Sequence, residues 1–134
     1  MDGRDVMRQF VPSSPFAADL GIRLEEIGDD AATLVLPFAS RLATIGDVVH
    51  GGAIATLADC AVMAAAWATP DAPDTLRGVT VSLTVEFLDT ARAEDLTAHG
   101  RVIRRGRSLC ACEVDVVTPG DRLVAKGLAT YKLG

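Results

Sequence analysis

The segment that most constrains the fold of this chain covers residues 51–67 and reads GGAIATLADCAVMAAAW. Its alanine-rich composition favours a helix, and its apolar residues fall on nearly all sides of that helix rather than on one stripe. The segment is short for a membrane span, and Asp59 lies in its middle. It therefore predicts a helix that other elements of a globular domain enclose on most sides.

Segments that alternate apolar and polar side chains flank this helix. Before it, residues 20–24 and 32–36 alternate on either side of a Gly28-Asp29-Asp30 turn, which predicts a β-hairpin. After it, residues 79–87 follow a clear period of two. Further strand candidates, separated by turn residues, cover 95–104, 108–117 and 123–133. The expected order is two strands, the helix and then a four-strand meander.

An antiparallel sheet is the only partner large enough to bury so apolar a helix. The predicted fold class is therefore α+β, with the sheet wrapped around one long central helix. The chain has 134 residues and no repeat or linker divides it, so we expect a single domain over 1–134. Residues 1–15 form an expected N-terminal extension, with a short helix at 4–10 that ends at Val11-Pro12 and a loop at 13–15.

Charge and cysteine content exclude several classes of function. A net charge of -5 argues against nucleic acids and anionic membranes, which bind basic surfaces. The N-terminus lacks an apolar signal region, so we expect a soluble cytoplasmic protein. Cys60, Cys110 and Cys112 are odd in number and have no nearby histidine, so we expect reduced thiols, no disulfide and no metal site.

The clearest chemical pattern is His50-Gly51-Gly52 followed by Asp59. The first amides of a helix lack intrahelical acceptors, and glycine lets a substrate carbonyl approach them, so this end of the helix can stabilise an oxyanion. A carboxylate on an apolar helix is costly unless it is paired or protonated, so it indicates either a structural partner or a function. Taken alone, His50 fits a supporting role and the glycine pair fits a turn.

Helix geometry separates the two reactive groups. Gly51 and Asp59 are eight residues apart, which corresponds to about 12 Å along the helix axis. One helix cannot bring both to a single carbonyl. If both act on the same acyl group, they come from two copies of the helix placed side by side in a dimer.

The run HGGAIATLAD, from His50 to Asp59, and the strand at 79–88 resemble the phenylacetate-degradation (PaaI-like) type of hotdog-fold thioesterase, over roughly residues 15–133. The resemblance implies hydrolysis of an acyl-CoA thioester to free acid and CoA. It assigns carbonyl polarisation to the Gly51 amide and the hydrolytic carboxylate to Asp59, with His50 and Gly52 as the rest of the motif. It also implies a homodimer with two composite sites, paired into a homotetramer, and no cofactor besides the CoA of the substrate.

Further site residues follow from the same resemblance. Thr80 lies where relatives carry a hydroxyl that orients the carboxylate or water, although threonine is also a good strand former. Thr44 stands where many relatives have Asn or Gln to bind the thioester carbonyl. Asp47 is a poor substitute, because a carboxylate repels an oxyanion. Arg104, Arg105, Arg107 and Ser108 resemble a segment that lies near the CoA phosphates, or they form a solvated turn.

Two alternatives stay open at this stage. A non-catalytic acyl-CoA-binding protein would keep the pocket without turnover, as Thr44 suggests. A hotdog acyl dehydratase or hydratase would need a catalytic histidine paired with a carboxylate, and only His50 and His99 are available. Neither the acyl group nor the role of Asp59 as nucleophile or general base follows from the sequence.

Overall fold

The structure is a computed structural model that describes residues 1–134. The order of two strands, a long helix and four further strands agrees with the one expected, with additional short elements before the long helix. The elements are α1 (Gly3–Ser13), α2 (Pro15–Leu20), β1 (Arg23–Gly28), β2 (Ala31–Leu36), the 3-10 helix η1 (Ser40–Leu42), β3 (Ala43–Ile45), β4 (Val48–Val49), α3 (Gly51–Trp67), β5 (Gly78–Phe87), β6 (Leu96–Arg105), β7 (Leu109–Val117) and β8 (Leu123–Leu133).

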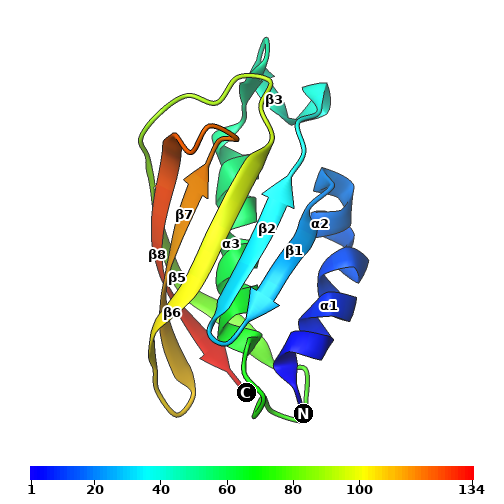
Figure 1. Ribbon diagram of the computed structural model, residues 1–134, viewed down its shortest axis with the longest axis vertical. Coiled ribbons are helices and arrows are strands. Elements are labelled where there is room, and N and C mark those ends of the chain that lie inside the picture. The colour runs from blue at the N-terminus through cyan, green and yellow to red at the C-terminus, as the bar shows by residue number, and fades with distance from the viewer.

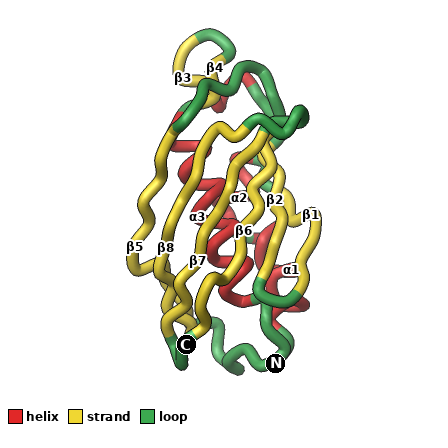
Figure 2. The backbone as a smooth tube through the Cα atoms, turned by 60° about the vertical axis from the view of Figure 1, so that its left-hand side comes forward, coloured by secondary structure: helices red, strands yellow, loops and turns green.

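Six strands form one antiparallel sheet in the order β1-β2-β6-β7-β8-β5, and β3 and β4 form a separate small hairpin. The sheet curves around α3, while α1 and α2 lie beside β1 and β2 (Figure 1). Seen from the side, α3 lies behind the strands along most of their length (Figure 2). The predicted α+β fold, a sheet wrapped around a central helix, is confirmed.

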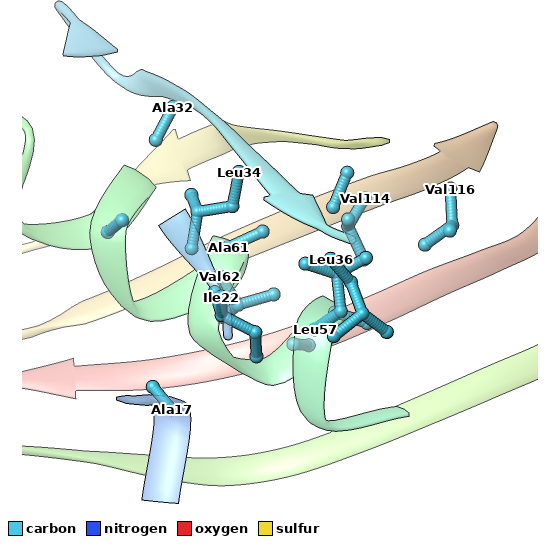
Figure 3. Packing of buried hydrophobic residues seen from close by; sticks show 14 of the residues in the cluster. Ala17, Ile22, Ala32, Leu34, Leu36, Leu57, Ala61, Val62, Val114 and Val116 are labelled. Atoms are coloured by element: carbon cyan, nitrogen blue, oxygen red, sulfur yellow. The ribbon is translucent and has the colours of Figure 1, made fainter. Parts of the chain in front are cut away.

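The core lies between α3 and the sheet. Leu57, Ala61 and Val62 of α3 have no exposed surface, and they pack against inward-facing side chains of β2 and β7 (Figure 3). Small residues on α3 let the helix approach the sheet closely: a Cβ built on Gly100 of β6 would lie 2.6 Å from the Ala61 carbonyl oxygen.

No helix of the protein is long and apolar enough to cross a membrane.

The expected four-strand meander was wrong in one respect. Strands β6, β7 and β8 do form a meander, but β5 pairs with β8 at the far edge of the sheet. Strand β6 already pairs with β2 on one side and with β7 on the other, so it has no free edge for β5. Alternation along a strand reports its two faces and carries no information on its neighbours.

The N-terminal region is also more helical than expected. Helix α1 continues through Pro12 to Ser13, held by the buried side chains of Met7 and Val11. Proline this close to the end removes a single amide donor, so tertiary packing outweighs its cost. The expected loop at 13–15 and the strand start at Leu20 give way to α2, which has Pro15 in its first turn and ends at Gly21 with a φ of 81°.

Candidate active site

The N-terminus of α3 is capped by the histidine that precedes it. The Gly52 amide donates to His50 Nδ1 at 2.7 Å, and the Ala53 and Ile54 amides donate to the His50 carbonyl oxygen. A Cβ on Gly52 would lie 2.9 Å from His50 Nδ1, so glycine at this position preserves the cap. The Gly51 amide has no acceptor within the protein, which leaves one donor open at the positive end of the helix dipole.

Phe87, near the end of β5, lies beside the open Gly51 amide. A Cβ on Gly51 would meet the Phe87 ring at 3.5 Å, an ordinary contact, so the ring sits directly against the start of the helix. Phe87 is 54% exposed in a single subunit. One wall next to the amide is therefore aromatic and open to a ligand or a neighbouring chain.

Asp59 has one partner in the protein. The Thr80 hydroxyl donates to Asp59 Oδ1 at 2.7 Å, so strand β5 holds a carboxylate that α3 carries about two turns from its start. Asp59 is half-buried, and its second oxygen accepts no hydrogen bond from the chain. Burial, with a contribution from the Asp59 charge, raises the pKa of the neighbouring Cys60 thiol to about 11, so this thiol is protonated at neutral pH.

One face of α3 is not covered by its own sheet. The helical residues that are exposed or half-buried share this face and are mostly small. They are Gly51, Gly52, Ala55, Thr56, Asp59, Cys60 and Met63. Small side chains let a second helix approach closely, and the one carboxylate of α3 lies in the middle of this face.

The remaining residues of the sequence prediction lie away from Asp59. Thr44 is exposed on the β3–β4 hairpin that precedes α3, near the start of the helix, and no hydrogen bond fixes its side chain. Asp47 pairs with Arg92 at 3.2 Å. Arg107 and Ser108 lie in the β6–β7 turn beside the C-terminal end of α3, where they line a cleft of about 220 Å³ with Arg105.

The three arginines of this turn differ in their surroundings. Arg105 donates to Asp30 Oδ1 at 2.7 and 2.9 Å and to the Ala66 carbonyl at 3.0 Å, so it joins the β1–β2 turn to the end of α3. Arg104 pairs with Ala111 on the exposed face of the sheet. The Arg105 ion pair joins residues 75 positions apart, a distance at which local sequence patterns carry no signal.

An open cleft of about 330 Å³ adjoins the start of α3 and was missed by sequence reasoning. It brings together residues of α2, η1, β3 and the first two turns of α3. Its lining consists of Phe16, Leu20, Arg41, Leu42, Ala43, His50, Gly52, Ala53 and Thr56. The only sequence signal for it was the HGG motif, because the other walls come from elements that were expected to be loop or strand.

Neither histidine is paired with a carboxylate. His50 Nδ1 is occupied by the Gly52 amide, and His99 Nδ1 contacts the Thr33 hydroxyl at 3.3 Å on the exposed face of the sheet. No group of three or more His, Cys, Asp or Glu side chains is placed to hold a metal ion. The start of α3 thus offers a free amide and an apolar cleft. A half-buried carboxylate lies about two turns farther along the same helix.

A curved antiparallel sheet around a helix that opens with His-Gly-Gly and carries a carboxylate about two turns later defines a hotdog-fold protein of the thioesterase class. The sequence matches the Thioesterase superfamily over residues 46–125, and the chain belongs to that family. One curated relative, from Halobacterium salinarum and named as a candidate esterase, is 32% identical over 90% of this chain and 81% of its own length. The family expected from the sequence is confirmed.

Solved structures support the same fold. Conserved protein PA5202 from Pseudomonas aeruginosa is 27% identical, with a TM-score of 0.84 over 94% of this chain and 98% of its own. The E. coli PaaI protein from the phenylacetic acid degradation operon is 19% identical, with a TM-score of 0.83 over 99% of this chain and 95% of its own. At 19% identity, the comparison with PaaI shows a similarity of fold alone.

Proposed function

We propose that this protein hydrolyses acyl-CoA thioesters to free acid and CoA, with Asp59 as the reacting carboxylate. The observation that carries the proposal is the Thr80 bond to Asp59, which holds one carboxylate oxygen and leaves the other free on the open face of an apolar helix. A carboxylate in such a place is costly for stability, and an oriented, half-buried carboxylate suits a general base or a nucleophile. Membership of the thioesterase superfamily supports the same reaction class.

The working unit in this proposal is a homodimer, which pairs further into a homotetramer. Antiparallel packing of two α3 helices through their uncovered faces brings Asp59 of one subunit beside Gly51 of the other, because the two residues are equally far from residue 55. The free Gly51 amide then polarises the thioester carbonyl, and the helix dipole stabilises the oxyanion. Each dimer contains two such sites.

The reaction has two balanced routes that begin from the same geometry. In one, Asp59 takes a proton from water while the water oxygen attacks the carbonyl carbon, and the C–S bond then breaks to give acid and CoA thiolate. In the other, an Asp59 oxygen attacks to form a mixed anhydride, CoA thiolate leaves, and water hydrolyses the anhydride. In both routes the thiolate finally takes up a proton.

The wider binding site in this proposal uses the remaining residues of the resemblance. It assigns Gly52 and Thr44 to the surroundings of the reacting carbonyl. It assigns Arg104, Arg105, Arg107 and Ser108 to the CoA phosphates, and the last three of these line the cleft at the β6–β7 turn. The dehydratase alternative has no support from a histidine–carboxylate pair. Measuring thiol release distinguishes the thioesterase from the non-catalytic acyl-CoA-binding alternative.

The test is thiol release from aryl-, short- and medium-chain acyl-CoA thioesters by wild-type protein and Asp59→Asn. Asparagine keeps the shape and the Thr80 contact but can neither take a proton nor attack. We expect wild-type turnover with at least one ester, a loss of roughly 1,000-fold or more in the variant, and retained ester binding. Hydrolysis of no ester by wild-type protein supports the binding module, and equal hydrolysis by both proteins removes Asp59 from the mechanism.

A further inference from the structure

The cleft at the start of α3 combines apolar walls with a single charged side chain. Phe16, Leu20 and Leu42 supply much of its apolar surface, and Arg41 is the only Arg, Lys, Asp or Glu among its lining residues. His50 turns Nδ1 toward the Gly52 amide and so acts as an acceptor there. A mostly apolar cleft with one cation is an environment for a ligand that is apolar along its length and anionic at one point.

Arg41 has free hydrogen-bonding capacity. One of its guanidinium N–H groups donates to the Asp19 carbonyl at the end of α2, and no ion pair of the chain includes Arg41. A guanidinium carries five N–H donors in a planar fork that matches a carboxylate. The bond to Asp19 fixes the side chain at the cleft and leaves most of the fork available.

The cleft adjoins the start of α3, the end of the helix at which the proposed function puts the thioester carbonyl. His50, Gly52 and Ala53 line it, and the open Gly51 amide lies between the first two of these residues in the chain. A thioester whose carbonyl reaches that amide can extend its acyl group along this wall toward Arg41, a step that rests on the proposed function. A volume of about 330 Å³ is near the lower end of ligand pockets, which span roughly 300–1,000 Å³, so it suits a short acyl group.

We propose that this cleft selects short acyl groups that end in a carboxylate, so that the preferred substrates are CoA thioesters of short dicarboxylic acids, with Arg41 as the specificity-determining residue. A wholly apolar acyl group would desolvate the Arg41 charge without giving it a partner, whereas a carboxylate forms a charge-assisted pair. The positive end of the α3 dipole favours the same charge. The chain has a net charge of -5, but Arg41 makes the charge of this cleft positive.

The test compares glutaryl-CoA with pentanoyl-CoA, which have the same number of acyl carbons and differ in the terminal carboxylate. We expect wild-type protein to have the higher kcat/KM for glutaryl-CoA. Arg41→Gln keeps an N–H for the Asp19 carbonyl but loses the charge, so it should lower kcat/KM for glutaryl-CoA by roughly 10- to 100-fold and should not lower kcat/KM for pentanoyl-CoA. Arg41→Lys should restore part of the preference.

Arg23→Gln is the matched control, because Arg23 also lacks an ion pair but lines a different groove, beside β1. Arg23→Gln should not change the ratio of kcat/KM for glutaryl-CoA to kcat/KM for pentanoyl-CoA. A wild-type preference for pentanoyl-CoA, or an equal loss for both substrates in Arg41→Gln, overturns the proposal, since either result reduces Arg41 to a support for α2.

A binding measurement separates this proposal from the proposed function. Both esters are titrated by calorimetry into Asp59→Asn and into Asp59→Asn/Arg41→Gln, so that no turnover is needed. Tighter binding of glutaryl-CoA that disappears with Arg41→Gln supports the selectivity even if wild-type protein hydrolyses neither ester. Equal affinity of the two esters for Asp59→Asn overturns it, whatever the fate of the hydrolysis experiment.

Discussion

Thr80 determines how the Asp59 carboxylate is presented. Its hydroxyl donates to Oδ1, and the β-branched side chain restricts χ1, so the donor is held in one direction from the rigid edge strand β5. The free Oδ2 keeps its lone pairs for a proton or a carbonyl carbon. A hydrogen bond to a charged group contributes about 1.5–3 kcal/mol, enough to fix the orientation of a side chain on an exposed helix face.

Thr80→Val is the substitution that isolates this hydrogen bond, because valine keeps the shape and lacks the hydroxyl. We expect kcat to fall roughly 10- to 100-fold with little change in KM, since the carboxylate is disoriented while the acyl cleft is intact. Steady-state kinetics on the best ester of the panel measures the effect. Thr84→Val on the exposed face of the same strand is the control, and an equal loss there would assign the effect to β5 as a whole.

At the scale of elements, the sequence predicted α3 and most strands because each carries its own periodic signal. Residues 51–67 are helical throughout, as expected, and the predicted strands at 79–87 and 108–117 agree with β5 and β7 within a few residues. The position of β5 beside β8 and the presence of α2 were missed, since strand neighbours and packing of short helices depend on contacts across the chain. Local pattern thus predicted the elements better than their arrangement.

The contact between α3 and β6 is one that no local pattern could reveal. Gly100 lies where the Ala61 carbonyl approaches the sheet, and both Leu96 and Ala98 on the same strand are fully buried against the helix. The absence of a side chain at residue 100 therefore sets the distance between the central helix and the sheet. The Thr80–Asp59 hydrogen bond joins the same helix to β5, at the other side of the sheet.

Gly100→Ala should destabilise the domain by about 1–3 kcal/mol, because its Cβ would lie 2.6 Å from a backbone oxygen that can move only with the helix. Urea unfolding followed by circular dichroism gives the change in the free energy of unfolding. Gly120→Ala serves as the control, since nothing lies within 4 Å of a Cβ there. Equal stability of the two variants would show that α3 shifts without cost.

At the scale of the whole molecule, the surfaces differ in what they offer a second subunit. The exposed face of the sheet carries an ion-pair network in which Arg101 and Lys126 pair with Glu113 and Asp115. Strand β5, by contrast, has an unpaired edge with Val81 57% exposed, and the uncovered face of α3 adjoins it. An apolar edge strand beside an uncovered helix face is the surface that most needs a partner.

The sequence predicted those parts of the candidate site that lie on a single element. Gly51 and Asp59 lie on one helix, so helical geometry alone fixed their separation and required two copies for a common substrate. Thr80 was assigned only through the family resemblance, and the cleft that Arg41 lines was not predicted, because it depends on how η1 and α2 fold against α3. Residues from distant segments meet through tertiary packing, which no periodicity encodes.

The proposed composite site makes a prediction that a site within one subunit does not. Gly51→Pro removes only the amide donor, because proline is well tolerated at the first helical position, and Gly51→Ala, which keeps the amide, is its control. Asp59→Asn and Gly51→Pro should each be nearly inactive. Mixed dimers, however, contain one site with an intact carboxylate and an intact amide, so subunits co-expressed in equal amounts should recover about a quarter of wild-type turnover. If the mixture stays as inactive as its parents while sequential affinity purification of differently tagged subunits shows mixed dimers, the two groups do not meet across the subunits and the dimeric mechanism fails.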